Sequence, residues 1–176
     1  ETPSLPSFIQ NVVATTVFID SRETLWLGTP NGLFAREKNQ QEFKPIIIQW
    51  ITPSNKEILD IKQSPTGQLL IGTFANGLVK VDPVTHQANV LLPESNNQLS
   101  YTTRQITLAK NGTFWIGSRC GFFEFDEATE QFTKHQNDSD IPTSIPHNSV
   151  LAICRDSKGD MWLGTRIGVY YCVDEK

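Results

Sequence analysis

The sequence lacks most of the features that mark a membrane protein, a metalloprotein or a disulfide-stapled domain. Its 176 residues include three cysteines, Cys120, Cys154 and Cys172, whose spacing fits neither a disulfide framework nor a zinc site. No uninterrupted apolar run approaches the roughly 20 residues that span a bilayer, and the most apolar stretches have the length of one strand. We therefore expect a folded domain of short strands in which the cysteines are small buried hydrophobic residues.

Strong charge of one sign is also missing. The 15 Lys and Arg residues against 19 Asp and Glu residues leave a net charge of −4, and the basic residues occur singly. This pattern excludes the electrostatic footprint of a nucleic-acid-binding protein. The first four residues, Glu1 to Ser4, lack the basic and apolar regions of a signal peptide, so a signal is either not needed or already removed.

Catalytic and metal-binding motifs are absent as well. His86, His135 and His147 have no paired spacing for a metal ion, and neither a G-x-S-x-G elbow nor a phosphate-binding G-x-x-x-x-G-K loop occurs. The run from Asp156 to Asp160 lacks the alternating acidic residues of a calcium loop and is more typical of a hairpin turn. The sequence therefore predicts no catalytic residue, no metal and no cofactor.

What the sequence does contain is an internal repeat. One phrase recurs four times, as LWLGT, LLIGT, FWIGS and MWLGT, at residues 25–29, 69–73, 114–118 and 161–165. Its glycines, Gly28, Gly72, Gly117 and Gly164, lie 44, 45 and 47 residues apart. That period matches one four-stranded blade of a β-propeller.

Each repeat carries the same signals in the same order. A β-branched apolar run comes first, then a tight polar turn, the shared phrase, a short loop that ends in glycine and a third strand. A weaker fourth run follows in three repeats, at residues 43–48, 88–92 and 131–135. We predict an all-β fold, a β-propeller of four repeats with four antiparallel strands each, over roughly residues 8–48, 56–92, 103–135 and 148–176.

The central phrase is expected to pack one blade against the next, because stacking of neighbours is what buries both faces of such a small sheet. This places three tryptophans and one leucine in the core between blades. At the four glycines a side chain would crowd the neighbouring blade or the turn. An aromatic sugar-binding platform is the alternative for the tryptophans, although a ligand would not need the same residue in nearly every repeat. The predicted core residues are Trp26, Leu70, Trp115, Trp162, Gly28, Gly72, Gly117 and Gly164.

The repeat resembles the two-component regulator propeller repeat. The fourth copy, from Val150 through Asp156 and residues 161–165 to Gly168, is similar to it almost residue for residue, whereas the second has Leu70 in place of tryptophan. The resemblance implies the periplasmic sensor region of a membrane-anchored bacterial receptor, often a hybrid histidine kinase and sometimes a protein with a cyclase output. Any such output would lie outside this chain.

The resemblance also implies a ring of seven blades, of which four repeats would be a fragment. An unusual closed ring of four blades is the alternative. The fourth repeat ends at Lys176, after its third strand, and residues 1–8 are an alternative source of the missing strand, disfavoured by Pro3 and Pro6. An open arc of four blades would expose two apolar faces. We therefore expect the remaining blades of a larger propeller, or further copies of the chain, as partners.

A ligand is expected on the face that holds the loops between second and third strands and the connections between repeats. Arg119 and Arg166 occupy equivalent positions in adjacent repeats and could together hold a carboxylate, a sulfate or an acidic sugar. Ordinary solvated arginines and a core role for Phe74 are the alternatives. The candidate ligand-binding residues are Asn31, Phe74, Asn76, Tyr101, Arg119 and Arg166.

These observations favour a non-catalytic propeller segment that senses a small ligand such as a glycan fragment. A protein-interaction scaffold, in which the same loops form a flat docking face, is the first alternative. A propeller lyase or hydrolase is the second.

Overall fold

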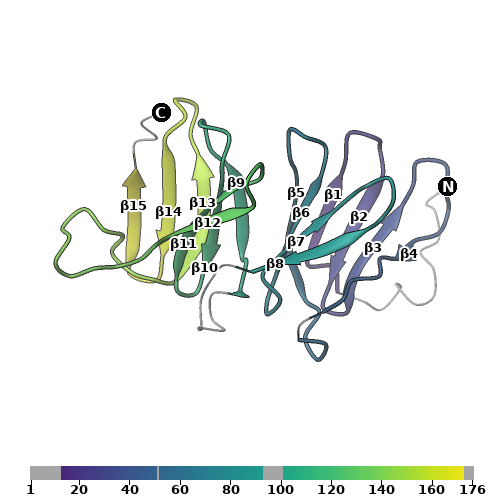
Figure 1. Cartoon of the computed structure of the whole chain (residues 1–176), viewed down its shortest axis with the longest axis horizontal. Coiled ribbons are helices and arrows are strands. Elements are labelled where there is room, and N and C mark those ends of the chain that lie inside the picture. The colour runs from purple at the N-terminus through teal and green to yellow at the C-terminus, as the bar shows by residue number, and fades with distance from the viewer. Residues whose placement is uncertain (1–12, 51, 93–100, 173–176) are drawn as a thin grey trace.

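The computed structural model describes residues 13–50, 52–92 and 101–172 as an all-β chain of fifteen strands in four sheets, here called blades 1 to 4 (Figure 1). Blade 1 consists of β1 (Thr16–Ile19), β2 (Leu25–Thr29), β3 (Gly32–Arg36) and β4 (Lys44–Pro45). Blade 2 consists of β5 (Ile58–Gln63), β6 (Leu69–Thr73), β7 (Leu78–Val81) and β8 (Ala88–Leu91). Blade 3 consists of β9 (Gln105–Leu108), β10 (Phe114–Ser118), β11 (Gly121–Asp126) and β12 (Gln131–His135). Blade 4 consists of β13 (Val150–Arg155), β14 (Met161–Thr165) and β15 (Gly168–Cys172).

Within each blade the strands pair antiparallel in the order of the sequence, and the blades stand side by side in chain order (Figure 1). The architecture is that of a β-propeller, as the period of the repeat predicts. Among the described segments no helix is long and apolar enough to cross a membrane.

The fourth strand of blade 1 is shorter than predicted. The run at residues 43–48 forms only the two-residue β4, paired with Phe34 and Ala35 of β3. Pro45 has no N–H group and cannot donate to the ladder, which limits the pairing. Beyond the strand, the Ile46 amide still donates to the Leu33 carbonyl at 2.9 Å.

The hydrophobic core lies between blades rather than inside them. Three of its four clusters are built from residues of two adjacent blades: blades 1 and 2, blades 2 and 3, and blades 3 and 4. Trp26 and Leu70 are completely buried in the first two of these clusters, and Trp115 is 5% exposed in the third. Burial on both faces explains why β6 and β10 are apolar throughout instead of alternating.

Polar contacts tie the first strands of neighbouring blades to one another. The Thr15 hydroxyl donates to the Ile58 carbonyl at 2.5 Å, across blades 1 and 2. Between blades 2 and 3 the Ile106 amide donates to the carboxylate of Asp60 at 2.8 Å, and the Ile153 amide donates to the Gln105 side chain, also at 2.8 Å, between blades 3 and 4. These bonds fix the angle at which each blade follows the last.

Blade 4 departs from the core pattern because its far face has no neighbour among the described residues. Trp162 is 39% exposed there, although the sequence predicts an inter-blade core position, and Val169 is 68% exposed. The same open face explains why Cys154 is exposed and not buried as expected. Cys120 is buried and Cys172 half-buried, and none of the three forms a disulfide.

An aspartate before the central tryptophan organises the first hairpin turn in blades 1 and 4. Asp20 accepts the indole N–H of Trp26 at 2.9 Å, and Asp156 accepts that of Trp162 at 3.0 Å. The second of these bonds lowers the pKa of Asp156. Blade 3 has alanine at the aspartate position, and there the indole N–H of Trp115 donates to the Glu124 carboxylate at 3.1 Å.

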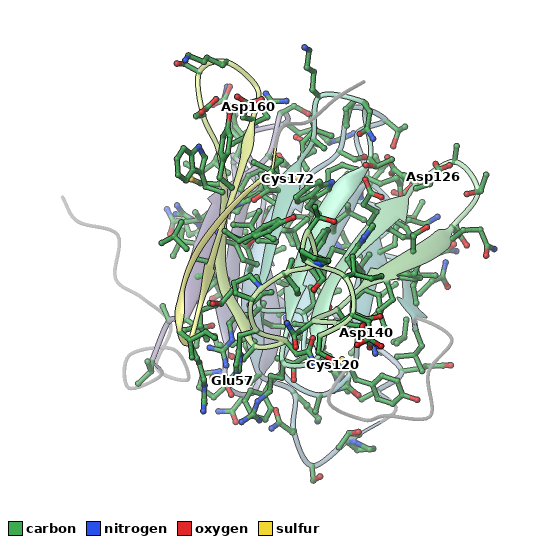
Figure 2. The ribbon with its side chains drawn as sticks, turned by 90° about the vertical axis from the view of Figure 1, so that its left-hand side faces the viewer. Glu57, Cys120, Asp126, Asp140, Asp160 and Cys172 are labelled. Atoms are coloured by element: carbon green, nitrogen blue, oxygen red, sulfur yellow. The ribbon has the colours of Figure 1, made fainter. Side chains whose placement is uncertain are left out.

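The connections lie at two opposite edges of the blades (Figure 2). One edge, here called the hairpin edge, carries the turns between first and second strands and between third and fourth strands, including Asp126 and Asp160. The other, here called the loop edge, carries the loops between second and third strands and the connections between blades, including Glu57, Cys120 and Asp140. Only the loop edge contains the residues predicted to bind a ligand.

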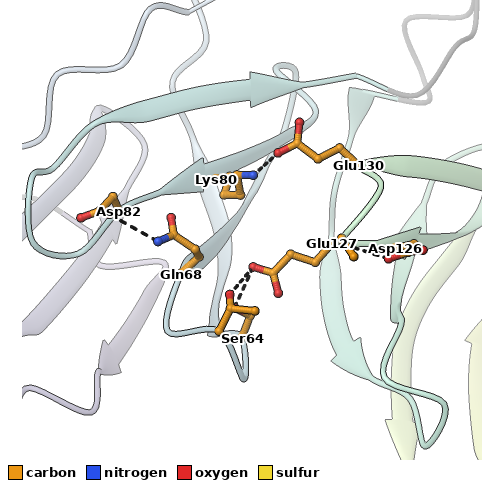
Figure 3. Close-up of polar contacts among 9 residues, drawn as sticks. Ser64, Gln68, Lys80, Asp82, Asp126, Glu127 and Glu130 are labelled. Carbon is orange, nitrogen blue, oxygen red and sulfur yellow. Dashed lines mark hydrogen bonds and ion pairs between the residues drawn. The ribbon is translucent and has the colours of Figure 1, made fainter.

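On the hairpin edge, side chains of blade 3 reach back to blade 2 (Figure 3). Glu127 accepts hydrogen bonds from the hydroxyls of Ser64, at 2.8 Å, and Thr66, at 2.7 Å, and Glu130 forms an ion pair with Lys80. These contacts join blades 2 and 3 at the hairpin edge.

The turn between β7 and β8 predicts an acid-sensitive contribution to stability. Backbone N–H groups of Thr85 and Val84 hold the carboxylate of Asp82 and lower its pKa from 3.8 to about 2. A carboxylate with a lowered pKa stabilises the fold above its unfolded value, and this contribution is lost as the pH falls from 3.8 toward about 2. In urea unfolding, the free energy of unfolding of wild type should therefore exceed that of Asp82→Asn at pH 5, and this difference should become smaller by pH 2. A difference in the free energy of unfolding that does not change with pH would contradict this role of the Asp82 carboxylate.

Candidate functional site

The same hydrogen bond occurs in all four loops between second and third strands. A hydroxyl at the end of the second strand donates to the carbonyl of the glycine that opens the next turn or strand, at 2.7–2.9 Å. The four donors are Thr29, Thr73, Ser118 and Thr165. This hydrogen bond holds each loop in a defined position on a rigid blade, which suits a recognition surface.

The loop of blade 2 also shows why glycine follows it. Gly77 has φ of +71°, and a Cβ atom there would lie 2.6 Å from the carbonyl oxygen of Leu91. Glycine is thus the residue that lets the loop turn tightly and leaves its outer side open.

Phe74 and Arg119, two predicted ligand residues, meet across blades 2 and 3. The guanidinium of Arg119 lies over the Phe74 ring, 5.6 Å from its centroid, and both residues are half-buried. A cation over an aromatic face is held electrostatically while its outer N–H groups remain available to an anion. The contact positions Arg119 from the neighbouring blade.

Asn76 has a structural role in place of the predicted ligand contact. It is completely buried, and its side-chain oxygen accepts from the Thr52 amide at 2.6 Å. Its side-chain nitrogen donates to the Asn55 carbonyl at 2.7 Å. The amide therefore braces the connection that enters blade 2, and a buried group with these partners has little capacity left for a ligand.

The other three candidates differ in accessibility. Asn31 and Arg166 are exposed on the loop edge, and no hydrogen bond or ion pair joins the guanidinium of Arg166 to a described residue. Tyr101 is half-buried, and its carbonyl accepts the Gly77 amide at 2.7 Å. The backbone of Tyr101 thus supports the loop of blade 2.

Arg104 is a further basic residue of this edge that the sequence did not single out. It comes directly before β9, the first strand of blade 3, and its amide donates to the Gly117 carbonyl at 2.8 Å. Its Nε atom is buried and has no hydrogen-bond partner among the residues that the structure describes. An unpaired donor of this kind is uncommon in a folded protein. Its only sequence signal is its place before the first strand of a repeat.

The arginines of the loop edge form no ion pair with a described residue. In the described parts of the chain, ion pairs are formed by Lys38 with Glu23, Lys62 with Asp60, Lys80 with Glu130 and His135 with Glu124. None of them involves an arginine. Arg104, Arg119 and Arg166 consequently keep their charge without a direct acidic partner among the described residues.

The titratable groups are dispersed. Across the described ranges no three His, Cys, Asp or Glu side chains gather as metal ligands would. His86 packs edge-on against Trp26, 5.6 Å between ring centroids, and the His147 ring accepts the Ser149 amide at 2.9 Å. Each histidine belongs to a different local contact.

A cavity of about 400 Å³ lies between blades 3 and 4, and the connection between these blades lines it with residues that include Asp138 and Ile145. Trp115, Phe122 and Glu124 line it from blade 3, and Tyr170 and Cys172 line it from blade 4.

Comparison with solved structures agrees with a β-propeller. Two extracellular domains from B. thetaiotaomicron, described as parts of hybrid two component systems, superpose with TM-scores of 0.79 and 0.76 at 22% and 21% identity. They cover 91% and 98% of this chain, which spans 21% of either domain. Virginiamycin B lyase from Staphylococcus aureus has a TM-score of 0.69 at 17% identity, with 95% of this chain and 57% of the lyase covered. The chain thus spans about a fifth of the first two structures.

The repeat itself has a family match. Residues 144–166, which include the first two strands of blade 4, match the two component regulator propeller. This confirms the resemblance of the repeats to that family. No curated protein matches the sequence closely enough to be called a relative.

Proposed function

We propose that this chain is a non-catalytic, ligand-sensing segment of a propeller in the periplasmic part of a membrane-anchored bacterial receptor. The repeat family and the likeness to extracellular domains of hybrid two component systems support this proposal. The kinase or cyclase that would transmit the signal lies outside this chain. The remaining blades of the ring are its structural partners.

The observation that carries the proposal is a set of three arginines on the loop edge that form no ion pair among the described residues. Arg104, Arg119 and Arg166 come from blades 3 and 4, and none forms an ion pair with a described residue. A planar guanidinium matches a carboxylate or a sulfate with two parallel hydrogen bonds. The ligand class that fits best is a glycan fragment with an acidic group, which the arginines would hold.

The dispersal of acid–base groups supports a binding role over catalysis. A general acid and base must both reach the same substrate, and nucleophiles need an adjacent base. Here the histidines of blades 2 and 3 and the connection after blade 3 each serve a separate local contact. A sensor needs only recognition, which the loop edge offers.

Removal of Arg166 tests the proposed site directly. We expect Arg166→Ala to weaken binding of a uronic-acid disaccharide at least tenfold, measured by calorimetry, because about 1.4 kcal/mol of a charge-assisted bond is lost. The unfolding free energy should change by less than about 0.5 kcal/mol, since the side chain is exposed. The neutral disaccharide should bind weakly to both proteins.

Arg155 provides the matched control. It lies in the same blade, is exposed and sits at the end of β13 on the hairpin edge. Arg155→Ala makes the same change of charge at the opposite edge and should leave binding unchanged. Equal losses of affinity in both variants would mean that net charge alone causes the effect, which would contradict a site at the loop edge.

A protein-docking face is the second candidate, favoured by apolar exposure on the same edge. Ile141 is 51% exposed and Ile167 is 68% exposed. Exposed apolar side chains beside arginines are also typical of protein interfaces. A partner protein whose binding is lost in Ile167→Ser but retained in Arg166→Ala would favour docking over glycan recognition.

A further inference from the structure

The wall that blade 3 presents to blade 4 contains a histidine–glutamate pair that breaks the apolar pattern of the repeat. In blade 2, Leu91 pairs with Leu78 and packs into the core shared with blade 3. His135 holds the place of Leu91 in blade 3, where it pairs with Phe122. Its Nε2 atom lies 3.1 Å from Oε2 of Glu124. Positions that depart from a structural pattern in this way are candidates for function.

Among the described residues, none from blade 4 forms an ion pair with Glu124. Its counterpart at the same register of blade 2 is Lys80, which forms an ion pair with Glu130 of the next blade. Glu124 instead pairs with His135 of its own blade. A carboxylate that is partly withdrawn from water is stabilised by a cation close to it. The space in front of Glu124 is therefore suited to a positively charged group.

That space is the cavity of about 400 Å³ between blades 3 and 4. Its volume falls in the range of small-molecule sites, about 300–1,000 Å³. Trp115 and Phe122 line it from blade 3, and their rings stack with 4.6 Å between centroids. Tyr170 lines it from blade 4, and Ile145 lines it from the connection between the two blades. Aromatic and aliphatic walls of this kind accept the apolar body of a ligand.

The polar atoms at the cavity favour a ligand that donates hydrogen bonds. The Glu124 carboxylate accepts one bond at each oxygen, from Trp115 and from His135, both at 3.1 Å, and keeps further lone pairs. The Tyr170 hydroxyl donates to the Thr143 carbonyl at 2.5 Å, so its oxygen can only accept from a ligand. Burial raises the pKa of Tyr170, which keeps this hydroxyl protonated. An ammonium group, with three donors and no acceptor, matches both residues.

Two further charged residues border the cavity. Asp138, in the connection between the blades, adds a second carboxylate. Lys134 adjoins His135 on β12, but neighbouring residues of a strand point to opposite faces. Lys134 pairs with Phe123, which belongs to the core shared with blade 2. The charged groups on the blade 4 side are therefore mainly carboxylates.

We propose that the cavity between blades 3 and 4 binds a small organic cation, an amine with an aromatic or aliphatic body. Its ammonium group donates to the Glu124 carboxylate and the Tyr170 hydroxyl, and its body lies among Trp115, Phe122 and Ile145. This site is separate from the arginines of the loop edge and takes a ligand of the opposite charge. It does not depend on the function proposed above.

Three probes of similar shape test the charge of the ligand. 2-Phenylethylamine, 2-phenylethanol and phenylacetate share a phenyl ring and a two-carbon chain. Calorimetry is done at about pH 8, above the ordinary titration range of histidine. We expect saturable binding of the amine, with an affinity at least tenfold higher than that of the neutral alcohol, and no binding of phenylacetate.

Glu124→Gln removes the charge and retains an oxygen that can accept the indole N–H of Trp115. We expect at least tenfold weaker amine binding, with Tm and the modification rate of the Cys172 thiol as in wild type when no ligand is present. Tyr170→Phe removes the second acceptor and should weaken amine binding at least threefold. Asp140→Asn is the matched control, because Asp140 is an exposed carboxylate of the same connection outside the cavity lining. It should bind the amine as wild type does.

Thiol protection locates the ligand. Cys172 lines the cavity, whereas Cys154 is exposed and pairs with Trp162 on the open face of blade 4. Saturating amine should slow modification of Cys172 at least threefold and leave Cys154 unaffected.

Three results would overturn the proposal. Equal affinity for the amine and the alcohol, or amine binding that Glu124→Gln leaves unchanged, would mean that the cavity does not select a cation. Amine binding without protection of Cys172 would place the ligand elsewhere on the chain. No saturable binding of any probe at millimolar concentration would mean that the cavity is not a site for such ligands.

Discussion

Replacement of Trp26 with alanine is expected to lower the free energy of unfolding by about 3–5 kcal/mol. The indole is completely buried between blades 1 and 2, among residues such as Ile58 and Val79. Its removal leaves a cavity in an inter-blade core and deprives the buried carboxylate of Asp20 of a hydrogen bond at 2.9 Å. Chemical denaturation monitored by circular dichroism measures the loss.

Trp162 is the matched control, because it occupies the same repeat position and makes the same bond to an aspartate, at 3.0 Å. Its side chain differs in burial, being 39% exposed on the open face of blade 4. Trp162→Ala should therefore cost only about 1–2 kcal/mol. Equal losses at the two positions would show that the hydrogen bond, and not packing between blades, sets the stability.

Alanine at Gly72 is expected to cost about 1–3 kcal/mol through overpacking. A Cβ atom at this position would lie 2.6 Å from the carbonyl oxygen of Thr103, at the entrance to blade 3. That segment has little room to move, because the Thr103 amide donates to the Thr73 carbonyl at 2.8 Å. Blade 3 would have to shift outward to accept the methyl group, and thermal unfolding should begin at a lower temperature.

Gly164 allows the same substitution at a position where no next blade lies among the described residues. The nearest atom to an added Cβ is the Cβ of Ala152, 3.5 Å away within blade 4 itself, which is ordinary contact. Gly164→Ala should change the unfolding free energy by no more than about 0.5 kcal/mol, or stabilise slightly by restricting the unfolded chain. A large loss at Gly164 would mean that the glycines are needed for backbone conformation and not for close approach of blades.

Much of the fold could be predicted from the sequence because the signals are local and repeated. The 44- to 47-residue period, the turn residues and the central phrase each specify one strand or hairpin, and four copies in phase leave little ambiguity. The prediction was weakest for the fourth run of blade 1, where Pro45 limits the strand to two residues. It also missed that Trp162 would be exposed, since burial of that position depends on a neighbouring blade.

The candidate site was less predictable. The sequence placed Arg119, Arg166 and Phe74 on one edge, because strand order decides where loops lie. It did not predict that Arg119 would pack on Phe74 from the next blade. Nor did it predict that the Asn76 side chain would be engaged in hydrogen bonds with the backbone of residues 52–55. The place of Arg104 before a first strand did not indicate that its Nε would be buried without a partner among the described residues.

The sequence by itself determined the secondary structure, the repeat and the class of fold, since the residues that specify a strand or a hairpin lie next to one another in the chain. Only the tertiary structure decided which groups remain available to a ligand and where the core is incomplete. Those properties depend on contacts between residues far apart in the chain, such as Arg119 with Phe74 and Ile106 with Asp60. Local propensity carries no record of such contacts, because they arise when one blade packs on the next.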